Sequence, residues 1–358
     1  MRPQPINNIM DIVPYKGGES KIAGFDKVHK LSSNENPLEC SPLARQAFIE
    51  EAQNLHAYPD GAHVKLREAI ATRYGLDVNR IICGNGSDEL FQLLGRSFIA
   101  PGDEIIQSEY GFLAYGLLAQ QQGAKCISAK TKDYVTQVDA IIAAITPKTK
   151  AIFLDNPSNP TGTYISFDEV KRLHAAIPSN IILVLDAAYA EYVNNNDYSA
   201  GLELAGEFEN VIMTRTFSKI HGLAALRIGW AYGARNIIDA MNRVRDPFNL
   251  NSAAIAAGVA ALNDYEFVAA SNAHNSKWLE ILSAEFNDNG FKAIPSVTNF
   301  IMVEFDSENT ANRFDEHLKS YGIIARKIGS YKLSQNIRIS IGTDEANQLL
   351  IKAMKEFK

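Results

Sequence analysis

Residues 181–186 read IILVLD, the most strand-like run in this chain of 358 residues. Apolar residues fill 181–185 without alternation, as in a strand buried on both faces of a parallel sheet. Similar runs occur at 150–154 (KAIFL) and 210–213 (NVIM). From residue 64 onward such runs alternate with helical patterns, which predicts a large α/β domain with a mostly parallel central sheet.

The rest of the chain predicts two further units around this domain. Residues 1–45 are rich in Pro, Gly, Asn and Ser and predict an extended segment that packs with the small domain and the active site. Residues 46–265 are the expected large domain. Residues 266–358 begin with a long helix and continue strand, helix, strand, helix, which predicts a smaller α+β domain.

Two local patterns inside the large domain give specific expectations. The apolar spacing at 135–145 predicts a helix. Ser166 and Glu169 form a capping box, which predicts that a helix begins there and runs to about residue 176.

Composition excludes several classes of protein. A net charge of -6 and a pI near 5.7 argue against a nucleic-acid or anionic-membrane partner. No apolar run reaches the ~18 residues of a membrane span, and no signal sequence is evident, so we expect a cytoplasmic protein. The three cysteines lie far apart and the seven histidines lack ligand spacing, so we expect neither a disulfide framework nor a metal site.

Polar residues follow successive predicted strands. Asp186 ends the run at 181–185, Asn159 lies in the rigid loop NPSNPTG (156–162), and Lys219 follows the run at 210–213. The turn GNGSDE (84–89) precedes a helix, where free N–H groups favour an anion, although it matches neither common nucleotide-binding loop. Because ligands of open α/β sheets bind beyond the carboxyl ends of the strands, these groups predict one site.

The stretch after 210–213 suggests the chemistry of that site. Thr216, Ser218, Lys219 and Arg227 supply two hydroxyls, an amine and a guanidinium, which suit a phosphorylated aldehyde. Taken singly, Lys219 reads equally as a solvated surface lysine and Asp186 as a helix cap.

Three other residues also have a simpler explanation. Tyr110 and Tyr189 alone are more often packing aromatics. Arg338 lies in the apolar strand IRISIG and must meet an anion, either a ligand or an internal carboxylate.

Eight motifs cover nearly the whole chain: PY (14–15), SSNENP (32–37), AYPDG (57–61), GNGSDE (84–89), NPSNPTG (156–162), LDAAY (185–189), TFSK (216–219) with LAALRIG (223–229), and NIRISIG (336–342). Together, and in this order, they resemble the fold-type I pyridoxal-phosphate-dependent aminotransferases, and within them the histidinol-phosphate aminotransferases. One position departs from that pattern, since Ala225 stands where the family more often has Gly.

The resemblance implies a role for each residue around pyridoxal 5'-phosphate. Lys219 would hold the cofactor covalently and carry a proton during the reaction, and Asp186 would pair with the pyridine nitrogen. Asn159 and Tyr189 would bind the phenolic oxygen, and Tyr110 would stack on the ring. The cofactor phosphate would be held by Gly86, Ser87, Thr216, Ser218 and Arg227.

It also implies how substrate binds. Arg338 and Arg326 would hold the phosphate of the amino donor or the carboxylates of glutamate. Tyr15 and Asn34 would line the substrate side. Tyr58 would reach the active site of a second copy, which implies a homodimer with shared active sites.

The implied reaction converts L-histidinol phosphate and 2-oxoglutarate into imidazole acetol phosphate and L-glutamate, in histidine biosynthesis. An aromatic (tyrosine or phenylalanine) or prephenate aminotransferase, or an enzyme with dual specificity, remains open, because small differences in substrate give weak discrimination. The same motifs also leave room for a threonine-phosphate decarboxylase or for a non-catalytic, cofactor-binding regulator.

Overall fold

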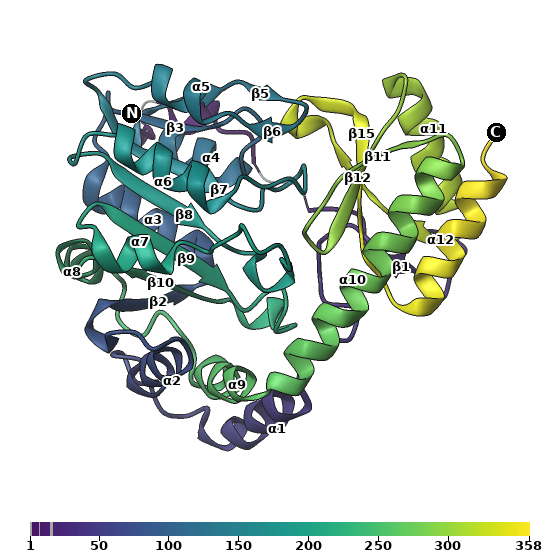
Figure 1. Ribbon diagram of the computed structural model, residues 1–358. Coiled ribbons are helices and arrows are strands. Elements are labelled where there is room, and N and C mark those ends of the chain that lie inside the picture. The colour runs from purple at the N-terminus through teal and green to yellow at the C-terminus, as the bar shows by residue number, and fades with distance from the viewer. Residues whose placement is uncertain (1, 7, 15–16) are drawn as a thin grey trace.

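A computed structural model describes residues 2–6, 8–14 and 17–358, and shows a large and a small body joined by one long helix (Figure 1). The large body contains a seven-stranded sheet in the order β2-β10-β9-β8-β7-β3-β4. The strands of this sheet are β2 (Ile81–Asn85), β3 (Glu104–Ser108), β4 (Lys125–Ala129), β7 (Thr149–Asp155), β8 (Ile182–Asp186), β9 (Val211–Thr216) and β10 (Ile228–Gly233).

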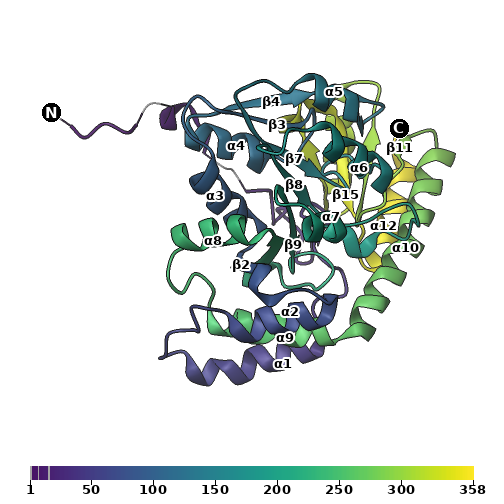
Figure 2. The same cartoon turned by 60° about the vertical axis from the view of Figure 1, so that its left-hand side comes forward.

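The predicted α/β architecture is confirmed. Strand β10 is antiparallel to both of its neighbours, and the other strands run in one direction. Every residue of β8 is buried, as its unbroken apolar run predicts. Helices cover both faces of the sheet (Figures 1 and 2).

Two apolar clusters fill the two sides of the sheet, because alternate residues of each strand point to opposite faces. One cluster joins the strands to α1 (Pro42–Glu51), α2 (Val64–Tyr74), α5 (Val138–Ala143), α6 (Phe167–Ala176), α7 (Leu202–Glu207) and α9 (Ser252–Asn263). The other joins them to α3 (Ser87–Phe98), α4 (Leu113–Gln122) and α8 (Arg235–Val244).

The small body is an antiparallel sheet with helices on one face. Its strand order is β11-β12-β15-β14, with bounds Lys292–Ile294, Phe300–Glu304, Leu333–Ser340 and Arg326–Ile328. Helices α11 (Glu308–Lys319) and α12 (Asp344–Glu356) pack on it with the end of α10 (Tyr265–Asp288), around a separate apolar cluster. Strand β1 (His29–Lys30) pairs with β13 (Ile323–Ile324), so the N-terminal segment is attached to the small body. The exact limits of the three units remain a prediction.

Two expectations about local structure have different outcomes. The Ser166 hydroxyl accepts the Glu169 N–H and α6 ends at Ala176, so the predicted helix start is confirmed. The helix predicted at 135–145 is wrong at its start, because β6 (Val135–Thr136) pairs with β5 (Thr131–Lys132) in a hairpin. The small strands β11, β13 and β14 were also missed, because two or three residues carry no readable period.

Short 3-10 helices occupy several connections, at Ile9–Asp11, Ala52–Asn54, Val78–Arg80, Ala190–Tyr192, Ala224–Leu226 and Gly329–Tyr331. Among the described residues, no single helix has the length and apolar character to cross a membrane. The pair α9 and α10 meets those criteria jointly, with a bend of 75° between the two helices.

Candidate active site

The polar groups predicted at strand ends come together at one edge of the large sheet. Strands β2, β7, β8 and β9 end at the same edge, so the turn at Gly86, Asn159, Asp186 and Lys219 lie around it. Arg338 of β15 reaches the same place from the small body and bonds the Asn159 side chain. The site therefore lies at the junction of the two bodies.

Asp186 is a buried carboxylate held by two hydroxyls. Tyr115 donates to Oδ2 at 2.6 Å, and Thr214, its register partner on β9, donates to Oδ1 at 3.3 Å. Burial raises the pKa of Asp186 to about 6, and the two hydroxyls act in the opposite direction. The carboxylate is thus oriented and ready to pair with a cation.

A second buried carboxyl, Asp155, lies beside it on β7, where its register partner is Asp186. Its Oδ2 accepts the Ser158 hydroxyl at 3.0 Å and the Asn159 N–H at 2.9 Å. Burial raises the pKa of Asp155 to about 8, so the group is mainly neutral at pH 7. It fixes the loop that carries Asn159.

Lys219 is partly buried within the site. Its amine donates to the Ser33 carbonyl at 3.2 Å and lies 5.7 Å from the centre of the Tyr189 ring. Desolvation, followed by the nearby Arg338, lowers the pKa of Lys219 to about 8. A lysine with a lowered pKa can act as a nucleophile near neutral pH, which is not the behaviour of a solvated surface lysine.

The N-terminal segment and the small body complete the wall of the site. The Asn34 amide donates to the Tyr189 hydroxyl at 2.9 Å, and its oxygen accepts the Ser340 hydroxyl at 3.0 Å. Arg338 donates to Asn159 Oδ1 at 2.5 Å and to the Ser32 carbonyl at 2.8 Å. Asn34 thus contacts Tyr189 and β15, although the resemblance assigns it to substrate.

Two guanidinium-bearing residues lie opposite each other on neighbouring strands. Arg326 on β14 is the register partner of Arg338 on β15, so their side chains leave the sheet on the same face. The Arg338 guanidinium also lies 5.3 Å from the centre of the Phe300 ring. Like charges placed directly opposite are unfavourable without a counterion, so this pair suits an anion.

An anion cup lies at the start of α3. Gly86 precedes the helix with φ 79°, and no side chain in the described part of the chain caps the N-terminus that Ser87 begins. Arg227 donates to the Ser218 hydroxyl at 3.1 Å, and a Cβ on Gly86 would collide with its guanidinium. A Cβ on Gly229 would lie 2.5 Å from the Gly86 backbone, so glycine is required where these loops meet. Open N–H groups and a guanidinium therefore face one small space.

Other predicted site residues have different surroundings. The Thr216 hydroxyl is engaged within its own loop, since it accepts the Ser218 N–H at 3.1 Å and donates to the Ile228 carbonyl. Tyr110 packs with Tyr134, with ring centres 5.9 Å apart. Tyr58 is 84% exposed and stacks on Phe248 at 4.8 Å.

Tyr15 and Ala225 are the remaining positions of the sequence motifs. Tyr15 lies outside the described residues. Ala225, the departure from the family pattern, is exposed in a 3-10 helix, and Arg227 still reaches Ser218.

Sequence reasoning missed three members of the site. Thr214 and Asp155 could have been found, because each is level with Asp186 in a parallel sheet. Tyr115 gave no signal, since its contact depends on how α4 packs on the sheet. All three orient groups that were predicted correctly to lie at the strand ends.

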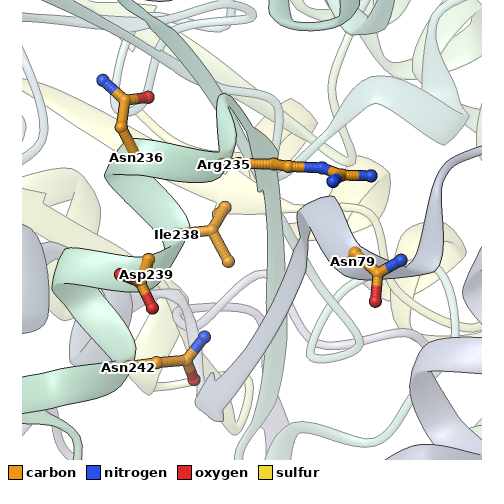
Figure 3. Close-up of a pocket in the computed structure, with 6 residues that line it drawn as sticks. All are labelled: Asn79, Arg235, Asn236, Ile238, Asp239 and Asn242. Atoms are coloured by element: carbon orange, nitrogen blue, oxygen red, sulfur yellow. The ribbon is translucent and has the colours of Figure 1, made fainter.

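A surface hollow of about 380 Å³ lies away from these residues (Figure 3). Its Arg235 pairs with Asp77 at 2.8 Å, and Ile238 is buried. It shares no residue with the predicted site and is lined by Asn79, Arg235, Asn236, Ile238, Asp239 and Asn242.

Comparison with known proteins agrees with this geometry. The pattern of the family described as aminotransferase class I and II matches residues 26–354. Histidinol-phosphate aminotransferases of Maricaulis maris and Rhodopseudomonas palustris are 51% and 50% identical to the chain, over 99% of its length and 98% of theirs. The crystal structure of histidinol-phosphate aminotransferase from Sinorhizobium meliloti in complex with pyridoxal-5'-phosphate superposes with a TM-score of 0.92 at 26% identity, covering 100% of this chain and 98% of that one. The chain therefore belongs to the class I and II aminotransferases, and within them to the histidinol-phosphate aminotransferase family.

Proposed function

We propose that this enzyme transfers the amino group of L-histidinol phosphate to 2-oxoglutarate, with pyridoxal 5'-phosphate as cofactor. The products are imidazole acetol phosphate and L-glutamate, and the reaction belongs to histidine biosynthesis. The proposal rests on family membership and on the fit of the site. An oriented carboxylate, an amine with a lowered pKa and an anion cup match the ring nitrogen, the aldehyde and the phosphate of this cofactor.

When bound, the cofactor supplies an electron sink that stabilises negative charge on the substrate carbon. Lys219 would hold the cofactor covalently through its amine, and the same amine would carry a proton from and to the substrate α-carbon. Asp186 keeps the ring nitrogen protonated, and Tyr115 and Thr214 keep Asp186 ionised and oriented. Tyr110 supplies a ring to stack on the cofactor.

The remaining polar groups orient the cofactor. The Asn159 amide and the Tyr189 hydroxyl bind its phenolic oxygen. The cup of Gly86, Ser87, Ser218 and Arg227 holds its phosphate, and helix α3 adds its positive end there. Thr216 supports this cup through the Ser218 backbone.

The observation that supports a phosphorylated substrate is the pairing of Arg326 with Arg338. A phosphate dianion matches two guanidiniums on one face better than a single negative charge does. The carboxylates of glutamate use the same pair in the second half of the reaction. Because Arg338 also bonds Asn159 on the cofactor side, a donor held by its phosphate at this pair keeps its amino group near Lys219.

The experiment compares L-histidinol phosphate with L-histidinol, which lacks only the phosphate. The formation of L-glutamate from 2-oxoglutarate is followed with each donor. We expect kcat/KM for the phosphorylated donor to be at least about 100-fold higher, because histidinol offers no anion to the arginine pair. Comparable values for both donors would refute recognition of the phosphate.

We further propose that the enzyme is a cytoplasmic homodimer in which Tyr58 completes the site of the partner subunit. Exposed apolar side chains gather on α1 and the segment that follows it, namely Phe48, Ile49, Leu55 and Tyr58. Residues 2–6 extend away from the body in Figure 2, and the apolar side chains of Ile6, Met10 and Val13 are exposed. Such a surface suits an isologous interface.

Mixing two inactive variants tests the shared site. Lys219→Ala and Tyr58→Ala are unfolded and refolded together, or coexpressed, so that subunits exchange. A mixed dimer then has one site with both residues intact, so random pairing restores about one quarter of the wild-type activity. Failure to restore activity in a verified mixed dimer would place Tyr58 in its own subunit's chemistry, and a fully active Tyr58→Ala homodimer would place it outside catalysis.

A further inference from the structure

The hairpin of β5 and β6 has an unusual tip. Asp133 and Tyr134 both have positive φ, 49° and 65°, which is the conformation of a two-residue turn that favours Asn–Gly. A bulky side chain in this region is disfavoured by its Cβ. A tyrosine in such a conformation points to a role for its side chain.

Tyr134 uses its ring to join the two bodies of the molecule. The ring packs on Tyr110 at the site and on an apolar cluster of the small body that includes Met302 and Leu333. Its hydroxyl accepts from Asn336 Nδ2 at 3.5 Å, and burial raises the pKa of Tyr134 to about 12. Figure 1 shows β6 at the border with the strands of the small body.

The backbone of the hairpin is tied to both cofactor-side loops. The Thr163 hydroxyl donates to the Tyr134 carbonyl at 2.9 Å, and the Ser158 N–H donates to the Thr163 carbonyl, next to Asn159. At the base, the Thr131 N–H donates to the carboxylate of Glu109, the neighbour of Tyr110, at 3.2 Å. The hairpin therefore contacts the segments that carry Tyr110 and Asn159.

We propose that the hairpin of β5 and β6 is an interdomain brace, in which Tyr134 positions strand β15 against the loops that carry Tyr110 and Asn159. Leu333, against whose cluster the Tyr134 ring packs, begins β15, so this ring contact sets where the Arg338 guanidinium of the same strand stands relative to the cofactor side. Tyr134 acts through these residues and is a positioning residue. The catalytic consequence rests on the proposed function, whereas the structural contact does not.

The test compares Tyr134→Gly with Asp133→Gly in the holoenzyme. Both relieve a positive φ in the same turn, but only the first removes the ring, and Asp133 is exposed. Tyr134→Phe keeps the ring. Tyr134→Asn removes the ring but supplies a residue that adopts a positive φ readily. The readouts are kcat/KM for L-histidinol phosphate, the thermal unfolding temperature and amide hydrogen exchange in 337–340 of β15.

We expect Asp133→Gly to keep wild-type kinetics and to unfold at the same or a higher temperature. Tyr134→Gly and Tyr134→Asn should lower kcat/KM about ten- to a hundredfold and speed hydrogen exchange in β15, because small displacements of Arg338 are costly. Tyr134→Phe should restore kcat/KM to within about threefold of wild type. If Tyr134→Gly and Asp133→Gly behave alike in kinetics and exchange, the brace is refuted.

Different results would contradict the proposed function and the interdomain brace. A wild-type enzyme that does not turn over histidinol phosphate would contradict the proposed function, but hydrogen exchange in β15 would still report on the brace. Faster exchange in Tyr134→Gly alone supports the brace whatever the substrate is. Unchanged exchange overturns it even if the wild-type enzyme is an active histidinol-phosphate aminotransferase.

Discussion

Replacing Tyr115 with Phe tests how the buried carboxylate of Asp186 is kept ionised. The substitution removes one hydroxyl, at 2.6 Å from Asp186 Oδ2, and keeps a ring that stacks on Phe153 at 4.8 Å. A hydrogen bond to a charged group contributes about 1.5–3 kcal/mol. Its loss therefore raises the pKa of Asp186 by about one to two units, because one unit corresponds to about 1.4 kcal/mol.

The sign of the effect follows from burial. Burial already raises the pKa of Asp186 to about 6, and the Tyr115 hydroxyl opposes this shift. Without the hydroxyl, half or more of the Asp186 carboxyl groups of the apoprotein are protonated at pH 7, so the residue offers less attraction to the ring nitrogen. As the pH is lowered, the affinity for pyridoxal phosphate should therefore begin to fall at a pH about one to two units higher in the variant than in wild type.

The assay titrates apoprotein with pyridoxal phosphate across the pH range and follows the visible absorbance of the bound cofactor. Tyr198→Phe is the matched control, because the Tyr198 hydroxyl donates at 2.8 Å to the Asn156 carbonyl rather than to a carboxylate. We expect the control to keep the wild-type pH dependence. If folded Tyr115→Phe loses its affinity for pyridoxal phosphate at the same low pH as wild type, the role of Tyr115 is refuted.

Three further substitutions test separate parts of the site. Lys219→Ala should fold and bind pyridoxal phosphate reversibly but show no multiple turnover, and sustained turnover would exclude Lys219 as the covalent residue. The pKa of Asp155 is raised to about 8 from the ordinary 3.8, so between these values the folded state binds more protons than the unfolded state and stability falls as pH rises. Asp155→Asn should therefore stabilise the apoprotein at pH 8 by a few kcal/mol, an effect that disappears near pH 4 in thermal unfolding. Arg326→Gln should raise KM for L-histidinol phosphate about tenfold or more and change that for L-phenylalanine little, whereas equal losses would mean that Arg326 does not read the phosphate.

The position of the site was predictable because it depends on regular structure. Parallel strands bring their carboxyl ends to one edge, so residues such as Asp186 and Asn159 could be grouped from the sequence alone. The same rule holds for the turn at Gly86, which begins α3 at that edge. The long apolar strands and capped helices were readable for the same reason, since each carries its own periodic pattern.

The missed features depend on contacts between elements far apart in the sequence. Tyr115 reaches Asp186 only because α4 packs on the sheet with its hydroxyl directed at β8. The hairpin at Tyr134 lacks the Gly that usually marks its turn, so its apolar spacing looked helical. The resemblance placed Arg326 and Arg338 together at one anion site, but their position directly opposite each other required the register of β14, a strand of three residues.

The most direct test of the account is a single-turnover experiment on the holoenzyme without 2-oxoglutarate. The visible absorbance of the bound cofactor is followed after rapid mixing with L-histidinol phosphate, and in parallel with L-phenylalanine. We predict rapid loss of the absorbance with L-histidinol phosphate and a much slower loss with L-phenylalanine, because only the first offers a phosphate to Arg326 and Arg338. Equal rates with the two donors, or loss only with L-phenylalanine, would contradict the proposed specificity.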